Sequence, residues 1–245
     1  MAIQTYRPTL NAGQVYMRVA GSAAPLRAVG NVSALVLEIS EDEKTLQDFT
    51  RPGGGQWAAV SRVTGVNASM TLHDLDPVNL SRAVYGGTSA VTGGSVTDEA
   101  HTAYQGGLIR LAHPKPTAVT VTSDPAGTTY VAGTDYEVRP EGILILDGGI
   151  ANAAPILVDY SYGAYDVVQA LTEGSKVFEL SFGGLNEANS NSPVILDIFR
   201  LQVSAASNLS LIGDDFAALE VKGKVLLAAT KTGTGVSRYF KVQMA

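Results

Sequence analysis

The sequence predicts a mainly β protein with one short helix and a small inserted β module. Three observations favour this fold class. Apolar and polar residues alternate in several segments, turns rich in Gly and Pro separate those segments, and a single stretch has the capping pattern of a helix. A chain of 245 residues can also bury a substantial core.

The early strands are predicted at residues 33–40 and 66–72. The apolar face of the second strand comprises Val66, Ala68, Met70 and Leu72. The helix follows in "DPVNLSRAVYGG", where Asp76 is the candidate N-cap, Pro77 occupies the first helical position and Gly86 can end the helix.

Dense turn chemistry between residues 102 and 165 predicts the inserted module, so residues 1–101 and 166–245 are expected to form one β domain. The glycine-rich passage before residue 101 is expected to be flexible. The module is rich in tyrosines, which fit strand faces better than a ligand platform. They are Tyr104, Tyr130, Tyr136, Tyr160, Tyr162 and Tyr165.

The last third returns to long strands, among them "SPVILDIFRLQV" and "FAALEVKGKVLLA". In the latter, Leu219, Val221 and Val225 alternate with charged residues, which indicates one buried face. A hairpin through "TKTGTG" is expected to pair residues 225–229 with residues 239–244.

Composition narrows the function classes. The formal net charge of −6 disfavours tight nucleic-acid binding, and the absence of cysteine excludes disulfides and thiolate chemistry. Only 16% of residues are charged, which hints at a surface that does not all face water. The start "MAIQTYRPTLNAG" lacks the pattern of a signal peptide and no apolar run is long enough for a membrane span, so we expect a soluble protein made in the cytosol.

No pattern predicts a catalytic residue, a metal site or a cofactor. The three histidines lack metal-ligand spacing, "PGGG" lacks the Lys and Ser/Thr of a phosphate loop, and "GDD" at residues 213–215 is better interpreted as a polar turn. An enzyme, such as a hydrolase, is therefore the least favoured class.

Two regions together carry a resemblance. Residues 30–86 contain a strand, an acidic stretch that ends in glycines, a strand that closes in "MTLHD", and a helix. Residues 165–244 contain "GLNEAN", "DIFR" and "LIGDDFAALEVKGKVL". This succession of blocks resembles the major tail tube proteins of long-tailed bacteriophages, and the inserted module resembles small β modules of other phage tail components.

The resemblance implies a β-sandwich or half-barrel that forms hexameric rings, which stack into a tube that conducts DNA during ejection. It implies a place in the virion tail after synthesis in the bacterial cytoplasm. The implied partners are further copies of the chain and the tape-measure, tail-terminator and distal tail proteins. A carbohydrate-binding or adhesive β module remains the alternative, suggested by the tyrosine-rich insert.

In such proteins a long loop between two early strands reaches the neighbouring ring, and residues 41–57 hold this position. We expect this stretch to be a loop that stays mobile in the free protein, because ordering costs about 1–2 kcal/mol per residue. The residues expected to form this assembly arm are Glu41, Asp42, Glu43, Lys44, Asp48, Phe49, Arg51, Gly53, Gly54, Gly55 and Trp57.

Two polar strand faces are candidates for lining the tube lumen, although an ordinary solvent-facing role is equally compatible with the pattern. The candidate residues are Asn67, Ser69 and Thr71 on one segment and Glu220, Lys222 and Lys224 on the other. An acidic or neutral lumen would let DNA slide without sticking, and the two lysines do not fit a purely acidic one.

Overall fold

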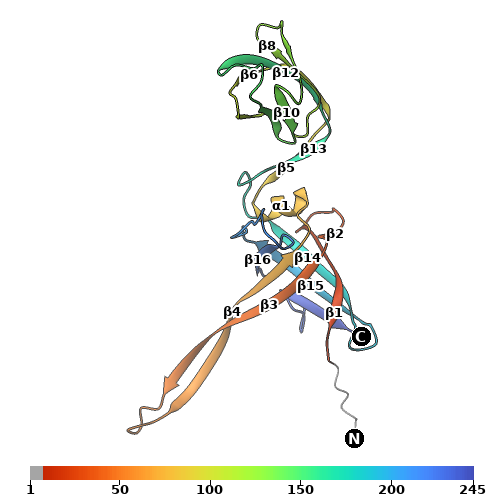
Figure 1. Cartoon of the computed structure of the whole chain (residues 1–245). Coiled ribbons are helices and arrows are strands. Elements are labelled where there is room, and N and C mark those ends of the chain that lie inside the picture. Colours follow the sequence, from red (N-terminus) through yellow and green to blue (C-terminus); the bar gives the residue numbers. More distant parts are fainter. Residues whose placement is uncertain (1–7) are drawn as a thin grey trace. The chain divides into compact units, whose positions relative to one another are not determined.

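The computed structural model describes residues 8–245, and in this range the predicted mainly β fold with one helix is confirmed (Figure 1). Residues 1–7, which belong to the amino-terminal segment expected to lack a signal peptide, lie outside the described residues. The described chain divides into two compact units. The first, which we call the sheet unit, contains residues 8–88 and 168–245, and the second, the module, is Ser89–Val167.

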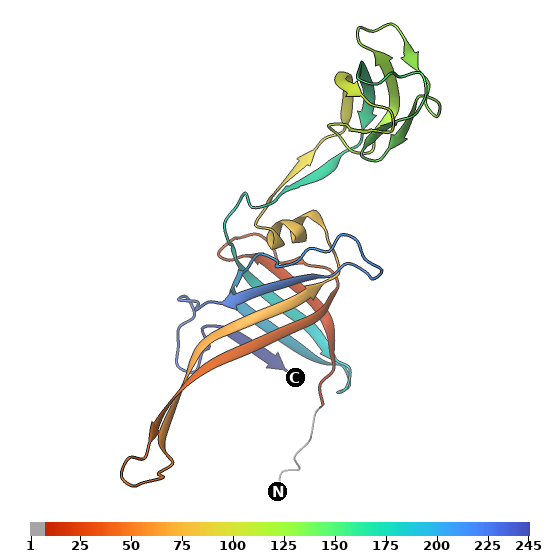
Figure 2. The same cartoon turned by 60° about the vertical axis from the view of Figure 1, so that its left-hand side comes forward.

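One antiparallel sheet builds the sheet unit, with the strand order β2-β1-β14-β15-β16-β4-β3 and with β17 paired to β15. Figure 2 shows that this sheet is curved, so the unit corresponds to the expected half-barrel and not to a sandwich of two sheets. Its strands are β1 (Asn11–Val19), β2 (Arg27–Ala28), β3 (Val32–Gln47), β4 (Gln56–Leu72), β14 (Val177–Asn186), β15 (Ser192–Val203), β16 (Leu219–Val225) and β17 (Phe240–Met244).

The core lies on one face of this sheet. The alternation predicted for β4 is confirmed, since Val66, Ala68, Met70 and Leu72 are buried. Strand β16 shows the same pattern, with Leu219, Val221 and Val225 buried between exposed residues. They pack in one cluster with Met17, Leu180 and Ile198 of the other strands, so a single apolar core holds the curved sheet together.

The predicted helix is also confirmed, as α1 (Pro77–Ala83). The Asp76 carboxylate accepts a hydrogen bond of 2.7 Å from the Asn79 amide and thereby caps the helix. The buried Asn79 side chain in turn donates to the carbonyl of Val29 at 2.8 Å. The helix therefore stays fixed at the end of β4, where the chain leaves the sheet.

The predicted hairpin between residues 225–229 and 239–244 is wrong. Strand β17 pairs with β15, from Val194↔Met244 to Ile198↔Phe240, whereas β16 pairs with the later residues 201–203 of β15. The twelve-residue strand β15 is long enough to offer one edge to both strands in succession. The connection through "TKTGTG" thus brings the chain back to β15 and does not make a tight turn.

The module has a core of its own, in which Val121, Ile143, Ile145, Ile156 and Val158 are buried. One of its sheets has the order β6-β12-β8-β9 and the other β10-β11-β7. The strands are β6 (Gly94–Ala103), β7 (Leu108–Arg110), β8 (Thr117–Ser123), β9 (Thr129–Tyr130), β10 (Tyr136–Arg139), β11 (Gly142–Ile145) and β12 (Ala154–Tyr162).

The module begins earlier than the expected residue 102, because β6 pairs with β12 and so belongs to it. The passage expected to be flexible is instead occupied by β5 (Gly87–Val91) and β6. Strand β5 pairs with β13 (Tyr165–Gln169), so the incoming and outgoing chain segments run side by side where the module begins and ends.

Candidate functional site

The hairpin formed by β3 and β4 extends beyond the body of the sheet (Figures 1 and 2). Every residue from Gln56 to Thr64 is exposed, whereas the next residues of β4 alternate between buried and half-buried. The partner residues 41–47 of β3 are exposed as well. Neither face of this part of the hairpin is covered within the described chain, and we call residues 41–64 the arm.

The expected mobile loop over residues 41–57 is wrong, because most of this stretch lies in paired strands. Glu41, Asp42, Glu43 and Lys44 pair in register with residues of β4, from Glu41↔Val63 to Lys44↔Val60. Only residues 48–55 lie outside the two strands. The residues expected to form an assembly arm therefore do project together, but on a hydrogen-bonded hairpin.

The tip of the arm is a turn organised by Asp48. Its amide donates to the carbonyl of Gly55 at 2.7 Å, and its carboxylate accepts hydrogen bonds from the amide and hydroxyl of Thr50 and from Arg51 Nε. The Thr50 hydroxyl and amide hydrogen bonds lower the pKa of Asp48. The turn needs glycine at two points: Gly53 has a φ of +72°, and a Cβ on Gly54 would lie 2.3 Å from the carbonyl oxygen of Asp48.

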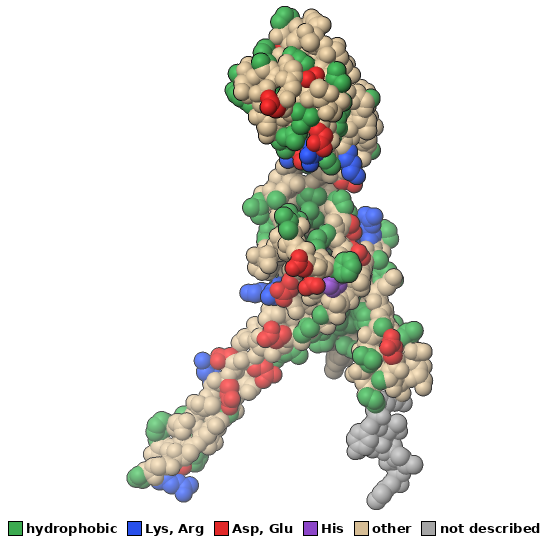
Figure 3. Space-filling view, in the orientation of Figure 1, with side chains coloured by type: hydrophobic (Ala, Val, Ile, Leu, Met, Phe, Trp, Pro, Cys, Tyr) green, Lys and Arg blue, Asp and Glu red, His purple; other side chains and the backbone are tan. Residues whose placement is uncertain are grey.

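The arm carries large apolar side chains that touch little else. Phe49 is 83% exposed and Trp57 is 63% exposed, and Leu46, Val60 and Val63 are exposed with them. Trp57 is the unpaired residue of a bulge, between the pairs Leu46↔Ala58 and Gln47↔Gln56. Figure 3 shows acidic side chains along the arm and hydrophobic ones near its tip. Exposed apolar groups in this number are typical of a surface that a partner covers.

The two polar faces proposed from the sequence meet on one surface of the sheet unit. Strands β4 and β16 pair as Thr71↔Glu220, Ser69↔Lys222 and Asn67↔Lys224. Cross-strand partners share a face, and this face lies opposite the buried side chains of both strands. We call Asn67, Ser69, Thr71, Glu220, Lys222 and Lys224 the polar face.

The polar face carries charges of both signs. Lys222 and Glu220 form an ion pair of 3.0 Å, and Glu38 of β3 lies opposite Asn67. A shallow groove of about 350 Å³ runs over Glu38, Ser69 and Lys222. Across the groove and the adjacent polar face, Glu38 and Glu220 balance Lys222 and Lys224, so this surface has no excess of positive charge.

The tyrosines of the module are mainly structural. Tyr136 and Tyr160 are buried, Tyr130, Tyr162 and Tyr165 are half-buried, and Tyr104 is exposed. The His113 ring stacks on Tyr162, with 3.6 Å between the ring centroids. Its Nδ1 lies 2.9 Å from the Tyr165 hydroxyl. The rings of His113, Tyr162 and Tyr165 thus contact one another, as expected for tyrosines that pack on the surface of strands.

In the comparison with protein families, a family model matches residues 8–243 and therefore nearly the whole chain. The matching family is described as "Protein of unknown function UCP028589". The chain belongs to this family. No curated protein matches the chain. In this member of the UCP028589 family, the structure describes no helix of the length and apolar character that crossing a membrane requires.

One exposed region of this UCP028589 family member was missed as a candidate. Residues 204–218, between β15 and β16, contain neither strand nor helix, and Ile212 and Phe216 on them are 95% and 96% exposed. The available signal was "LSLIGDDFAAL", in which apolar residues flank two adjacent acids without the alternation of a strand. The "GDD" turn is thus part of an exposed apolar loop.

Proposed function

We propose that this chain is a structural protein that assembles with copies of itself into stacked hexameric rings, forming the tail tube of a bacteriophage. In this proposal the protein is not an enzyme. It lies in the virion tail, and the assembled tube conducts DNA during ejection. Its further partners are the tape-measure, tail-terminator and distal tail proteins.

The observation that carries the proposal is the arm. A hairpin with both faces exposed and with Trp57 and Phe49 at its tip has no partner within the described chain. Such a hairpin gains contacts only when another molecule packs on it. The arm therefore supports assembly, and the contact that we propose for it is with a copy in the adjacent ring.

The edges of the sheet support the same proposal. Among the described residues, β3 pairs with β4 alone, so its outer edge leaves backbone groups unpaired along sixteen residues. Long open edges attract further strands, and proteins that remain monomeric usually block them. A neighbouring copy in a ring would cover this edge.

The polar face is our candidate for the lumen. Its two lysines are balanced by Glu220 and by the neighbouring Glu38 of β3, so no excess of positive charge is present to hold the phosphates of DNA. Ser69 and Thr71 contribute small, uncharged side chains to it. Both properties suit a channel in which DNA has to move.

Electron microscopy of the purified chain at increasing concentration tests the proposal, with size-exclusion chromatography and light scattering to count copies. A shortened variant, in which Asn-Gly replaces residues 44–60, keeps the pair Glu43↔Ser61 at the end of a two-residue hairpin. We expect rings or tubes from the parent chain, and a folded variant that forms no tubes. Tubes of normal length from the shortened variant would remove the arm from this role.

A further inference from the structure

A groove of about 590 Å³ lies over β1, β14 and β15 in the sheet unit. The segment 228–231 forms one of its walls, and Leu26, Phe199 and Ala229 give it apolar lining. Its volume falls in the range of sites that hold several large side chains or a small organic molecule. No residue of β4 or β16 lines the groove, so an occupant would leave most of the polar face uncovered.

The groove has two positive charges without an ion-pair partner. Arg18 pairs with Glu179 at 2.6 Å and Asp197 pairs with Lys241 at 3.6 Å, so these charges are compensated. Arg200 and Lys231 form no ion pair among residues 8–245.

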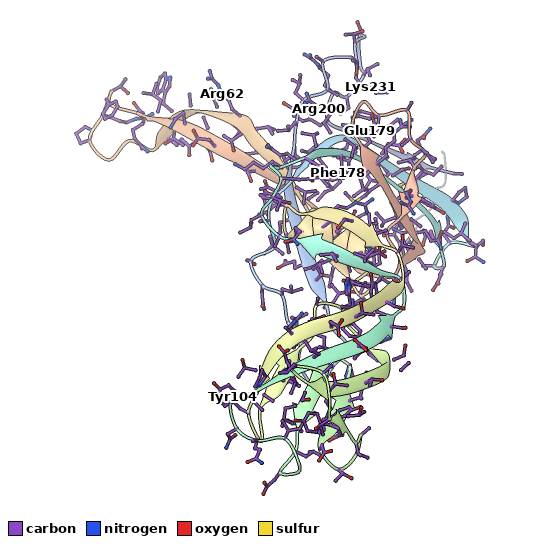
Figure 4. The ribbon with its side chains drawn as sticks, turned by 90° about the horizontal axis from the view of Figure 1, so that it is seen from above. Arg62, Tyr104, Phe178, Glu179, Arg200 and Lys231 are labelled. Atoms are coloured by element: carbon purple, nitrogen blue, oxygen red, sulfur yellow. The ribbon has the colours of Figure 1, made fainter. Side chains whose placement is uncertain are left out.

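The two cations are held in place by other contacts. Arg200 Nη1 donates to the carbonyl of Leu227 at 3.1 Å, and Lys231 Nζ lies 4.7 Å from the centre of the Phe199 ring. Figure 4 labels Arg200 and Lys231 together with Glu179. The groove therefore suits an occupant that is apolar and negatively charged.

The loop of residues 204–218 has these two properties. Leu211, Ile212 and Phe216 are at least 77% exposed, which means that the described chain offers them almost no contact. Asp214 and Asp215 lie between them and form no ion pair within residues 8–245. The loop thus has two uncompensated anions beside apolar side chains, and the groove has two uncompensated cations beside an apolar lining.

We infer that loop 204–218 of one copy binds in this groove of the next copy. Ile212 and Phe216 contact the apolar lining, while Asp214 and Asp215 lie against Arg200 and Lys231. The inference rests on the proposed self-assembly and names the surfaces through which two copies meet. The tip of the arm is a poorer occupant, because its Asp48 carboxylate already pairs with Arg51.

The contact is heterologous, since the loop and the groove are different surfaces of the same chain. Each pair of copies then has one loop and one groove left to bind further copies. A contact of this kind closes into a ring when its rotation is a whole fraction of a turn, and otherwise it forms a helical filament. It would link neighbours within a ring and leave the arm available for the next ring.

Disulfide cross-linking tests the contact directly, because the chain contains no cysteine. One variant has Phe216→Cys on the loop and the other has Ala229→Cys in the groove, and the two are mixed under mild oxidation. We expect a covalent dimer of one copy of each. The control mixes Phe216→Cys with Tyr104→Cys, an exposed position in the module, and should give no more dimer than either variant alone.

Charge reversal supplies an independent test. D214K/D215K places cations on the loop and R200D/K231D places anions in the groove, so each variant alone should associate at least about tenfold more weakly than the parent chain. A mixture of the two variants restores opposite charges at every contact and should recover association. Circular dichroism of each variant checks that it is folded.

The outcomes separate this inference from the proposed function. If tubes form while neither reversal affects them and no loop-to-groove disulfide appears, the contact is refuted and the tube remains. If the disulfide and the recovery by mixing are observed without any ring or tube, the contact stands and the tail tube proposal fails. A chain that shows no association, no recovery and no disulfide overturns both.

Discussion

The Tyr160 hydroxyl donates a hydrogen bond of 2.5 Å to Glu99 Oε2 inside the module. The other carboxylate oxygen, Oε1, lies 2.7 Å from His101 Nε2 and accepts from the amide of Ala112 at 3.1 Å. This small network joins β6 and β12 to the loop that follows β7. Tyr160 itself is only 2% exposed, so its hydroxyl has no water to replace the carboxylate.

Tyr160→Phe removes one of these hydrogen bonds without changing the packing of the ring. We expect the free energy of unfolding of the module to fall by about 1.5–3 kcal/mol at neutral pH, since the acceptor is charged. Chemical denaturation followed by tyrosine circular dichroism measures the change. Tyr104→Phe alters an exposed tyrosine of the same module and should have almost no effect; equal losses in the two variants would contradict the role of the network.

The same network predicts how the stability of the module depends on pH. Burial alone would raise the pKa of Glu99, but hydrogen bonds from Tyr160, His101 and the Ala112 amide lower it below the ordinary 4.5. The ionised carboxylate therefore contributes stability above about pH 4.5, and this contribution is lost as the pH falls through the folded pKa. Thermal unfolding at a series of acidic pH values should show a decline that Glu99→Gln reduces.

At high pH a different group matters, and here the neutral form of the side chain is the one that stabilises the module. Burial, together with the neighbouring Glu99, raises the pKa of Tyr160 to about 12. The neutral hydroxyl contributes its full stability below the ordinary value of 10.0, and the contribution disappears as the pH rises towards 12. Titration of phenolate absorbance should show ionisation that continues towards pH 12, and Tyr160→Phe should reduce this late part of the curve. If all tyrosines titrated together near 10, this assignment would be wrong.

Adjacent glycines at the tip of the arm offer a matched pair of variants. A Cβ on Gly54 would lie 2.3 Å from the Asp48 carbonyl oxygen, whereas a Cβ on Gly55 meets nothing within 4 Å. Gly54→Ala should distort the turn and speed amide exchange at Thr50, while Gly55→Ala should leave the exchange unchanged. Equal rates of amide exchange at Thr50 in the two variants would contradict the described turn.

Strand β4 allows the core and the arm to be compared within one element. Met70 is buried in the sheet unit, so Met70→Ala should reduce its free energy of unfolding by about 2–5 kcal/mol. Val63 is 58% exposed on the arm, and Val63→Ala should change stability by less than about 0.5 kcal/mol. Urea denaturation of the two variants and the parent chain gives both values. A large loss with Val63→Ala would mean that the arm packs on the sheet.

The parts of the fold that could be predicted are those in which one side of a segment is buried. The alternation of Val66, Ala68 and Met70 exists because one face of β4 meets the core, and the Asp76 cap has a local cause in the backbone of the helix. The arm has no such signal. Both faces of the arm are exposed, so its fold does not require an apolar residue at every second position. Its charged residues then look like those of a loop.

Pairing between distant segments could not be predicted for a different reason. Residues close in sequence favour a hairpin, and this led to the wrong pairing of residues 239–244 with residues 225–229. The edge of β15 that β17 pairs with instead exists only in the folded sheet, so no local sequence pattern marks it. The polar face shows the same limit: Ser69 and Lys222 were recognised as polar strand residues, but only the register of β4 on β16 makes them neighbours.

Because β5 pairs with β13, the chain leaves the sheet unit and returns to it on neighbouring strands. Any foreign domain whose termini lie close together could be grafted between these two strands without interrupting the curved sheet. If the chain polymerises as proposed, each such graft would be displayed once per copy, and the particle would serve as a regularly spaced scaffold for enzymes or antigens.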